Sequence, residues 1–217
     1  NDPVLAIQSL RRNGAQKIAY VDIDAHHPDG VEHAFADDPD TLQISVHEEN
    51  RWPRTGQIVD AGVGQVFNLP VPAGLHDDEM ALIRDQIILP LVAGFQPDAV
   101  VLQCGADAVT EDPQSRLTLS NNAHWAIVAA LQPIARRYLV LGGGGYNPWS
   151  VGRLWTGVWA TLNGYEIPDH LPPAAQSVLG ALEWLGPLRR HYPQDHWVTN
   201  LRDAPRGGAI RDAVRER

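Results

Sequence analysis

The stretch that decides the fold is KIAYVDIDAHHPDG, residues 17–30, in which an apolar run leads directly into carboxylates and imidazoles. The run at 17–23 is typical of a buried β-strand. Comparable apolar runs predict further strands at 42–47, 98–105 and 136–144. Helical patterns lie at 2–12, 77–94, 121–135, 148–163 and 172–185. Near-continuous apolar strands that alternate with helices predict an α/β fold, with a parallel sheet flanked by helices.

The composition is that of an ordinary globular protein and excludes several classes. The chain has 217 residues, of which 44% are hydrophobic and 20% charged. A formal net charge of -9 argues against nucleic acid as a partner. No apolar run reaches the roughly 18–20 residues that cross a bilayer, so no membrane partner is expected. The single cysteine, Cys104, excludes an intramolecular disulfide and favours a reducing, cytoplasmic location.

Two carboxylates and an imidazole converge at the end of the first strand. Side chains alternate along a strand, so Asp22, Asp24 and His26 point to one face. In open parallel sheets the carboxyl ends of the strands are where ligands bind. A buried group of this kind favours a cation, and Asp with His suits Zn²⁺ or another divalent ion. The alternative is a polar strand end that only caps the next loop.

Two later strand ends bring further candidates to the same edge of the sheet. Asp107, in GAD at 105–107, is a possible third ligand, and three protein ligands with one open position are typical of catalytic zinc. Asp107 and Asp112 are also open to interpretation as turn or cap residues. The run LGGGGYN, 141–147, permits close approach of the backbone, although alone it favours a flexible turn. Its Tyr146 could donate a hydrogen bond to a developing oxyanion.

The motifs DIDAHHPDGVEHAF, LQCGAD and LGGGGYN, in this order, resemble the zinc-dependent histone deacetylase superfamily. The bacterial acetoin-utilisation deacetylases are the more similar branch, and residues 147–164 also look like it. The resemblance covers residues 1 to about 165 and implies the arginase/deacetylase fold. It implies zinc ligation by Asp24, His26 and Asp107, and transition-state stabilisation by Tyr146.

The same resemblance implies roles for residues around the zinc ligands. Asp22 and Asp29 support the catalytic histidines of the family, and Trp52, Gly144 and Gly145 lie at the substrate pocket. For Trp52, simple core packing is the usual alternative for a lone tryptophan. A potassium site behind the zinc is implied as well, formed by Asp22, Asp24, His26, Ser45 and Val46.

One part of the family pattern is missing. In the family the acid/base pair is a His-His dipeptide upstream of the zinc strand, and none of the 23 residues before Asp24 is a histidine. His27 points to the opposite face from His26, so we expect a packed supporting group and not a general base. The chain therefore resembles the C-terminal portion of a longer enzyme, with a sheet that is incomplete at its N-terminal side. Two smaller departures are Pro28, where most relatives have Gly, and Gln114 at the pocket rim.

The expected organisation is one domain in two parts, a metal-binding part at 1–165 and a helical or irregular extension at 166–217. The expected function is zinc-dependent hydrolysis of an acetyl-amide, such as acetyl-lysine, with this chain alone inactive. Alternatives are an inactive metal-binding fragment that lacks the base, and an acetylpolyamine or other amidohydrolase on the same scaffold. A binuclear, arginase-like hydrolase needs further Asp and His ligands near Asp107, which GADAVTED does not offer. The oligomeric state is not indicated.

Overall fold

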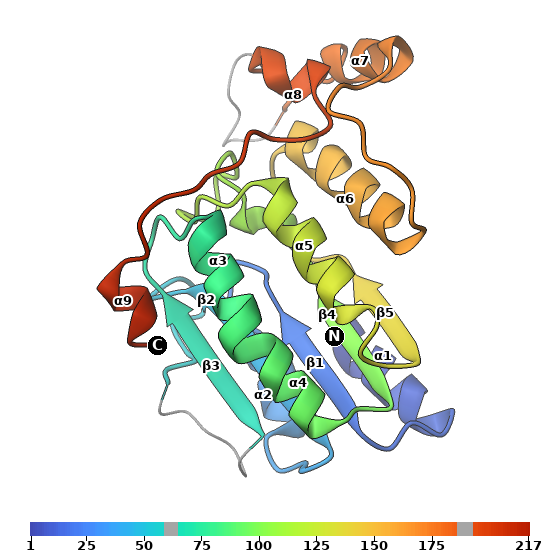
Figure 1. Cartoon of the computed structure of the whole chain (residues 1–217), viewed down its shortest axis with the longest axis vertical. Coiled ribbons are helices and arrows are strands. Elements are labelled where there is room, and N and C mark those ends of the chain that lie inside the picture. The colour runs from blue at the N-terminus through green and yellow to red at the C-terminus, as the bar shows by residue number, and fades with distance from the viewer. Residues whose placement is uncertain (59–64, 186–192) are drawn as a thin grey trace.

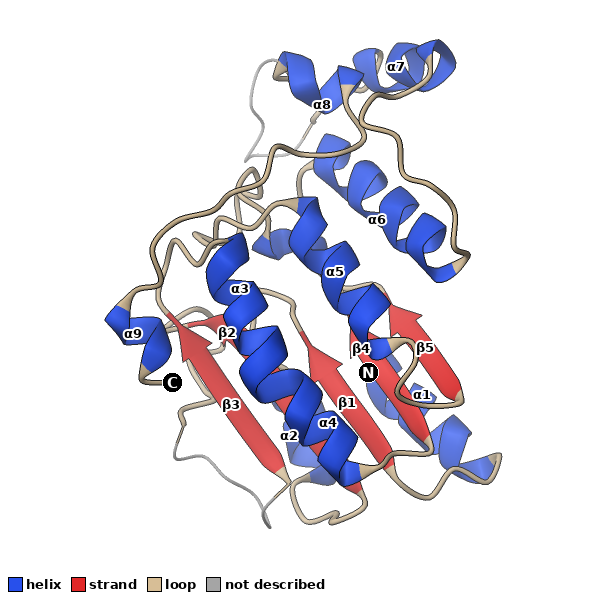
Figure 2. Ribbon diagram, in the orientation of Figure 1, coloured by secondary structure: helices blue, strands red, loops and turns tan. Residues whose placement is uncertain are grey.

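A parallel sheet forms the centre of the fold. The computed structural model of the protein describes residues 1–58, 65–185 and 193–217. Its strands lie in the order β3-β2-β1-β4-β5, and every neighbouring pair is parallel. The prediction of a parallel sheet flanked by helices is confirmed (Figures 1 and 2). The bounds of the strands are Ile18–Asp22 (β1), Thr41–Glu48 (β2), Val66–Val71 (β3), Ala99–Gln103 (β4) and Arg137–Leu141 (β5).

Helices cover both faces of this sheet. In Figure 1 the helices α3, α4 and α5 lie in front of the strands, while α1 and α2 lie behind them. The bounds are Asp2–Arg12 (α1), Asp29–Phe35 (α2), Asp77–Ile83 (α3), Leu89–Phe95 (α4), Asn121–Leu131 (α5), Pro148–Leu162 (α6), Pro173–Gly180 (α7), Asp195–Thr199 (α8) and Asp212–Arg215 (α9). The short helices α2, α8 and α9 were not among the predicted ones, because each has too few residues to show a periodic apolar pattern.

Strand β1 is buried on both sides and contributes to two hydrophobic cores. Ala19 and Val21 belong to the core under the front helices. Ile18 and Tyr20 belong to a smaller core with residues of α1 and α2. This alternation is the reason why the whole strand reads as apolar until Asp22. Cys104, which follows β4, is completely buried in the front core.

The helical pattern at 77–94 is interrupted in its middle. The chain forms α3, then a π-helical turn over Arg84–Ile88, and then α4. Pro90 lies in the first turn of α4. Proline lacks an N–H and its ring clashes with the carbonyl four residues earlier. The wider π turn just before Pro90 accommodates it, so the helix continues to Phe95.

Two strands end earlier than the apolar patterns predict. Strand β4 stops at Gln103 and β5 stops at Leu141. The next residues leave the sheet but stay bonded to one another. The Cys104 N–H donates to the Leu141 carbonyl (3.0 Å), and the Ala106 N–H donates to the Gly144 carbonyl (2.6 Å). The ends of β4 and β5 are therefore joined above the sheet, where the candidate site residues lie.

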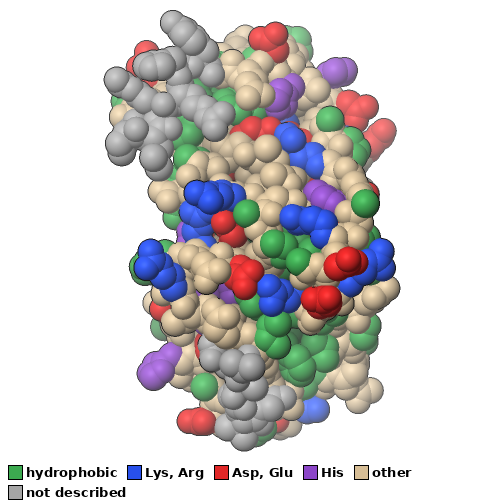
Figure 3. Space-filling view, turned by 90° about the vertical axis from the view of Figure 1, so that its left-hand side faces the viewer, with side chains coloured by type: hydrophobic (Ala, Val, Ile, Leu, Met, Phe, Trp, Pro, Cys, Tyr) green, Lys and Arg blue, Asp and Glu red, His purple; other side chains and the backbone are tan. Residues whose placement is uncertain are grey.

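The last part of the chain, residues 201–217, is called here the C-terminal strap. It runs from α8 across the front of the molecule to α9, beside β3 (Figure 1). On that side of the molecule, side chains of both charges are mixed across the surface (Figure 3). At the other edge of the sheet, Arg137 and Leu139 of β5 are exposed. Within the described residues, no helix is both long enough and apolar enough to cross a lipid bilayer.

Candidate metal centre

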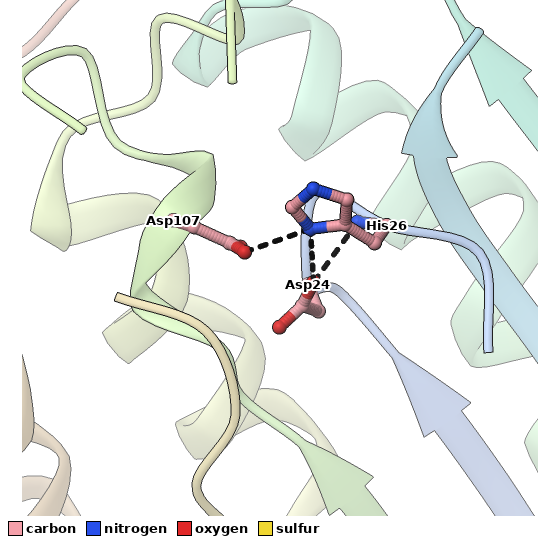
Figure 4. A group of neighbouring side chains, drawn as sticks. All are labelled: Asp24, His26 and Asp107. Atoms are coloured by element: carbon pink, nitrogen blue, oxygen red, sulfur yellow. Dashed lines mark hydrogen bonds and ion pairs between the residues drawn. The ribbon is translucent and has the colours of Figure 1, made fainter. Parts of the chain in front are cut away.

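Three side chains converge above the carboxyl ends of β1 and β4. Asp24 and His26 come from the segment after β1, and Asp107 comes from a 3₁₀ turn, Ala106–Ala108, after β4 (Figure 4). Their ligand atoms lie within 4.8 Å of one another. Among the described residues, no other group of His, Cys, Asp and Glu meets this geometry. The structure therefore brings together the three residues that the sequence pattern pointed to.

The imidazole lies between the two carboxylates. His26 Nδ1 is 3.1 Å from Asp24 Oδ1 and 2.9 Å from Asp107 Oδ2. Hydrogen bonds to Asp107 and Asp24 raise the pKa of His26 to about 10. Burial raises the pKa of Asp107 to about 6, and the charge of Asp24 acts in the same direction. In the absence of another cation, the His26 imidazolium balances the negative charge of Asp24 and Asp107. Two carboxylate oxygens and one imidazole nitrogen are also a donor set that suits a divalent metal ion.

Backbone amides hold the ligands in place. The Ala25 N–H donates to Asp107 Oδ1 (2.8 Å), and the His26 N–H donates to Asp24 Oδ1 (2.9 Å). The Gly144 N–H donates to Asp24 Oδ2 (2.7 Å). Burial alone would raise the pKa of Asp24, but hydrogen bonds from His26 and Gly144 lower it below its ordinary value. The ligand carboxylates are thus oriented by the strand ends themselves.

Two side chains that the sequence did not indicate support the Asp107 turn. The Ser115 hydroxyl donates to the Asp107 carbonyl (2.6 Å). His124 of α5 is completely buried and contacts the Gly105 carbonyl through Nε2 (3.0 Å). Neither residue has a local pattern that marks this role, because both act across the fold on backbone carbonyls.

The glycine run is needed because the backbone passes directly over the ligands. A Cβ atom on Gly144 would lie 1.9 Å from Asp107 Oδ2, and one on Gly143 would lie 2.8 Å from Asp24 Oδ2. Gly145 adopts a φ of +144°, which disfavours any side chain. The glycines therefore allow the backbone to pass close to Asp24 and Asp107, and the alternative of a merely flexible turn is not supported.

Tyr146 follows the glycines and lies near the same carboxylates. Its side chain is 48% exposed. Partial burial raises the pKa of its phenol above the ordinary value, and the charges of Asp107 and Asp24 raise it further. The phenol therefore keeps its proton at neutral pH and is available as a hydrogen-bond donor.

Asp22 lies one step deeper than Asp24, as the strand alternation predicts. It is buried, and it accepts hydrogen bonds from the Tyr20 hydroxyl and from the Asp24 N–H. Burial raises the pKa of Asp22 well above its ordinary value, with the charge of Asp24 as a further cause. Asp22, Asp24 and His26 line one hollow of about 340 Å³. Asp29 also lines this hollow, and its carboxylate accepts the Gly30 N–H.

The residues of the predicted potassium site lie on neighbouring strands. Ser45 of β2 is the register partner of Asp22 on β1, and Val46 follows it in the buried strand. The Ser45 hydroxyl is 2.8 Å from His47 Nδ1. The potassium site stays a prediction, since these contacts do not show which oxygens face a cation.

Two aromatic side chains near the ligands differ in burial. The Trp52 side chain is 71% exposed, and its ring centroid is 6.5 Å from that of His26. The alternative of core packing for Trp52 is therefore wrong. His27 is buried instead, with Nδ1 2.9 Å from Thr55 Oγ1 and Nε2 3.0 Å from Glu32 Oε2. These contacts fit a packed supporting group rather than a base.

Comparisons with known proteins place the chain among histone deacetylase relatives. Residues 1–162 match the histone deacetylase domain. AcuC, the acetoin utilization protein of Bacillus subtilis, is 35% identical over 185 residues, which cover 80% of this chain and 48% of AcuC. Human histone deacetylase 1 is 37% identical over 177 residues, which cover 79% of this chain and 36% of that protein. A crystal structure of an HDAC homologue from Aquifex aeolicus has a TM-score of 0.88 and 31% identity, covering 100% of this chain and 60% of that one.

The chain belongs to the histone deacetylase family. The expected resemblance to the acetoin-utilisation branch and the expected arginase/deacetylase fold are both confirmed. The chain spans about half the length, or less, of the curated relatives described above.

Proposed function

We propose that the protein is a metal-dependent deacetylase that hydrolyses an acetyl-amide such as acetyl-lysine. The observation that carries this proposal is the convergence of Asp24, His26 and Asp107 with Tyr146 at adjacent strand ends. Relatives of this chain bear the names of histone deacetylases. Acetylpolyamines and other small acetyl-amides are the alternative substrates.

We propose that Asp24, His26 through Nδ1, and Asp107 hold Zn²⁺. The fit rests on the donor set, because the two carboxylate oxygens and Nδ1 lie within 4.8 Å and face no other cation than the imidazolium in the described structure. A zinc ion bound there supplies Lewis-acid polarisation of a carbonyl and lowers the pKa of water. Iron or cobalt suits the same donors. The potassium ion proposed at Asp22, Asp24, His26, Ser45 and Val46 has a structural role.

Side chains of the protein supply the other functions of the proposed site. Tyr146 donates its phenolic proton in a hydrogen bond to the oxyanion that develops on the acetyl carbonyl. Its raised pKa keeps that donor protonated. Trp52 borders the entry to the ligands and contacts the alkyl chain of the substrate, with the backbone of Gly144 and Gly145 opposite. Asp22 and Asp29 accept hydrogen bonds from the acid/base groups and orient them.

Amide hydrolysis needs a general acid/base close to the metal ligands, and the described residues place no such group there. His27 is committed to Thr55 and Glu32, and no histidine precedes Asp24 in the chain. We therefore propose that the 217-residue chain binds metal but does not turn over substrate alone. This observation also favours the second candidate function, a metal-binding module without catalysis. We further propose a cytoplasmic location, because a chain with a single cysteine forms no intramolecular disulfide and fits a reducing compartment.

The test is acetate release from an acetyl-lysine peptide with zinc present. It compares this chain with a form extended by the upstream segment of AcuC, provided that this segment supplies the His-His pair. We expect activity in the extended form only. Asp107→Ala should abolish it, and Tyr146→Phe should lower kcat roughly 100-fold or more. Tyr165→Phe is the matched control, because Tyr165 is exposed and stacks on Trp159. Activity that survives Asp107→Ala would refute the proposal.

A further inference from the structure

Asp112 joins two loops that follow different strands. Its Oδ1 accepts the N–H of Gln114 at 2.8 Å, within the loop after β4. Its Oδ2 accepts the N–H of Tyr146 at 2.6 Å, from the loop after β5. The carboxylate is buried, with 4% of the residue exposed. A local turn explains only the first of these bonds, so the second one needs another reason.

The position of Tyr146 depends on its backbone. No hydrogen bond to the phenol is present in the described structure, and the side chain is half exposed. The four glycines before it, Gly142 to Gly145, impose little conformational restriction of their own. The bond from Asp112 is therefore the contact that fixes Tyr146 itself, next to a weaker bond from Asn147 Nδ2 to the Glu111 carbonyl (3.2 Å).

We propose that Asp112 is a positioning residue for Tyr146. By binding both loops, its carboxylate sets the place of the Tyr146 phenol relative to the metal ligands and to Gln114 at the rim. The proposal rests on the proposed function, in which that phenol stabilises the oxyanion. Asp112 is not among the side chains whose ligand atoms lie within 4.8 Å of one another at the metal centre, so it acts through Tyr146 and not as a fourth ligand.

A carboxylate is the side chain that this arrangement requires. Two N–H groups approach from two different loops, and each needs an acceptor oxygen. An asparagine offers one acceptor oxygen, and its NH₂ group would face the other N–H. Hydrogen bonds to an ionised acceptor are also shorter and stronger than neutral ones, which agrees with the 2.6 Å distance to Tyr146.

The test compares Asp112→Asn and Asp112→Ala with Asp98→Asn as the control. Asp98 also accepts two backbone N–H groups, from Gln16 and Lys17, but it precedes β4 at the opposite end of the sheet. Zinc affinity is measured by calorimetry, and hydrogen exchange of the Tyr146 amide is measured by NMR, both on the 217-residue chain. Values of kcat and KM are measured in the extended form described above.

For both Asp112 variants we expect zinc affinity within about threefold of the wild type. The Tyr146 amide should exchange at least about tenfold faster, since it loses a charge-assisted bond. In the extended form kcat should fall roughly 10- to 100-fold with KM nearly unchanged, because the donor is misplaced while binding contacts remain. Asp98→Asn should leave all of these values unchanged.

Two results would overturn the proposal. One is an unchanged exchange rate of the Tyr146 amide in Asp112→Ala. The other is a loss of zinc affinity that matches the loss of kcat, since Asp112 would then support the ligands and not Tyr146. A wild-type extended form that releases no acetate refutes the proposed function instead, and the amide exchange and zinc affinity then decide the role of Asp112 separately.

Discussion

Buried carboxylates lie both along the C-terminal strap and at the metal centre, but the partners of these carboxylates differ. Along the C-terminal strap each one meets an arginine: Asp203 meets Arg153, and Glu79 meets Arg211. At the metal centre Asp24 and Asp107 meet His26, and no Lys or Arg pairs with them in the described part of the chain. A buried charge without a partner is costly, so arginines offset the carboxylates along the strap, whereas at the metal centre the single imidazolium of His26 faces two carboxylates. The proposed divalent cation would supply the remaining positive charge.

The largest expected effect tests the metal centre. On the proposed zinc site, zinc binds the folded chain and not the unfolded one, so zinc at about 100 times its Kd should stabilise the wild type by about 2.7 kcal/mol. For a chain of this size the melting temperature should rise by roughly 5–10 °C. Asp107→Ala should show no rise, because it removes one of three ligands. Thermal melts with zinc and with a chelator check this.

Asp98→Asn is the control for the zinc melts, because Asp98 lies at the other end of β4. It should keep the full zinc-dependent rise. A similar rise in Asp107→Ala would contradict the assignment of Asp107 as a ligand.

A smaller effect is expected at the strap. Glu79 accepts hydrogen bonds from the backbone N–H and from Nε and Nη2 of Arg211, at 3.0, 2.8 and 2.7 Å. Glu79→Gln should lower the free energy of unfolding by about 2 kcal/mol, the scale of a lost charged hydrogen bond. Urea unfolding at pH 7 measures this. An unchanged free energy of unfolding would show that the attraction between Glu79 and Arg211 only offsets the free-energy cost of removing their charges from water.

The same pair gives a pH dependence of defined sign. Burial alone would raise the pKa of Glu79, but the hydrogen bonds and charge of Arg211 lower it below its ordinary value of 4.5. The ionised form of Glu79 is therefore more stable, relative to the protonated form, in the folded protein than in the unfolded chain. This contribution is complete above about pH 4.5 and is lost as the pH falls through the lower folded-state pKa. The difference in stability between the wild type and Glu79→Gln should therefore shrink at pH 3.

The smallest effect is expected at the exposed base of the strap. Asp169 pairs with Arg202 at 3.2 Å, but its side chain is 75% exposed. Asp169→Asn should change the free energy of unfolding by less than about 0.5 kcal/mol, because water screens the pair. Unfolding at low and high salt measures this, and a loss above 2 kcal/mol would contradict the contrast between exposed and buried pairs.

The convergence of the candidate metal ligands was predictable because their signals are local. The alternation of Asp22, Asp24 and His26 follows from strand geometry, and Asp107 follows the apolar run at 98–105. The strap was not predictable, since the bond from Arg211 to Glu79 joins residues 132 positions apart. The hydrogen bond between Asp112 and Tyr146 was not predictable for the same reason, because the two residues are 34 positions apart. The local sequence around Asp112 is typical of a turn and gives no sign of this bond. The division of the chain near residue 165 stays a prediction.

The strap also has a consequence for the order of events during synthesis. The ribosome delivers α3 long before residues 203–211 emerge, yet Arg211, which pairs with Glu79, and Asp203, which pairs with Arg153, both lie in that stretch. A nascent chain that ends after β5 therefore still lacks the arginine pair of Glu79 on α3, and after α6 it still lacks the carboxylate pair of Arg153. Contacts of such large separation form late. Consolidation of this part of the fold is thus a step that follows translation of residues 203–211, and nascent chains stalled before residue 203 would be the ones that chaperones and proteases meet.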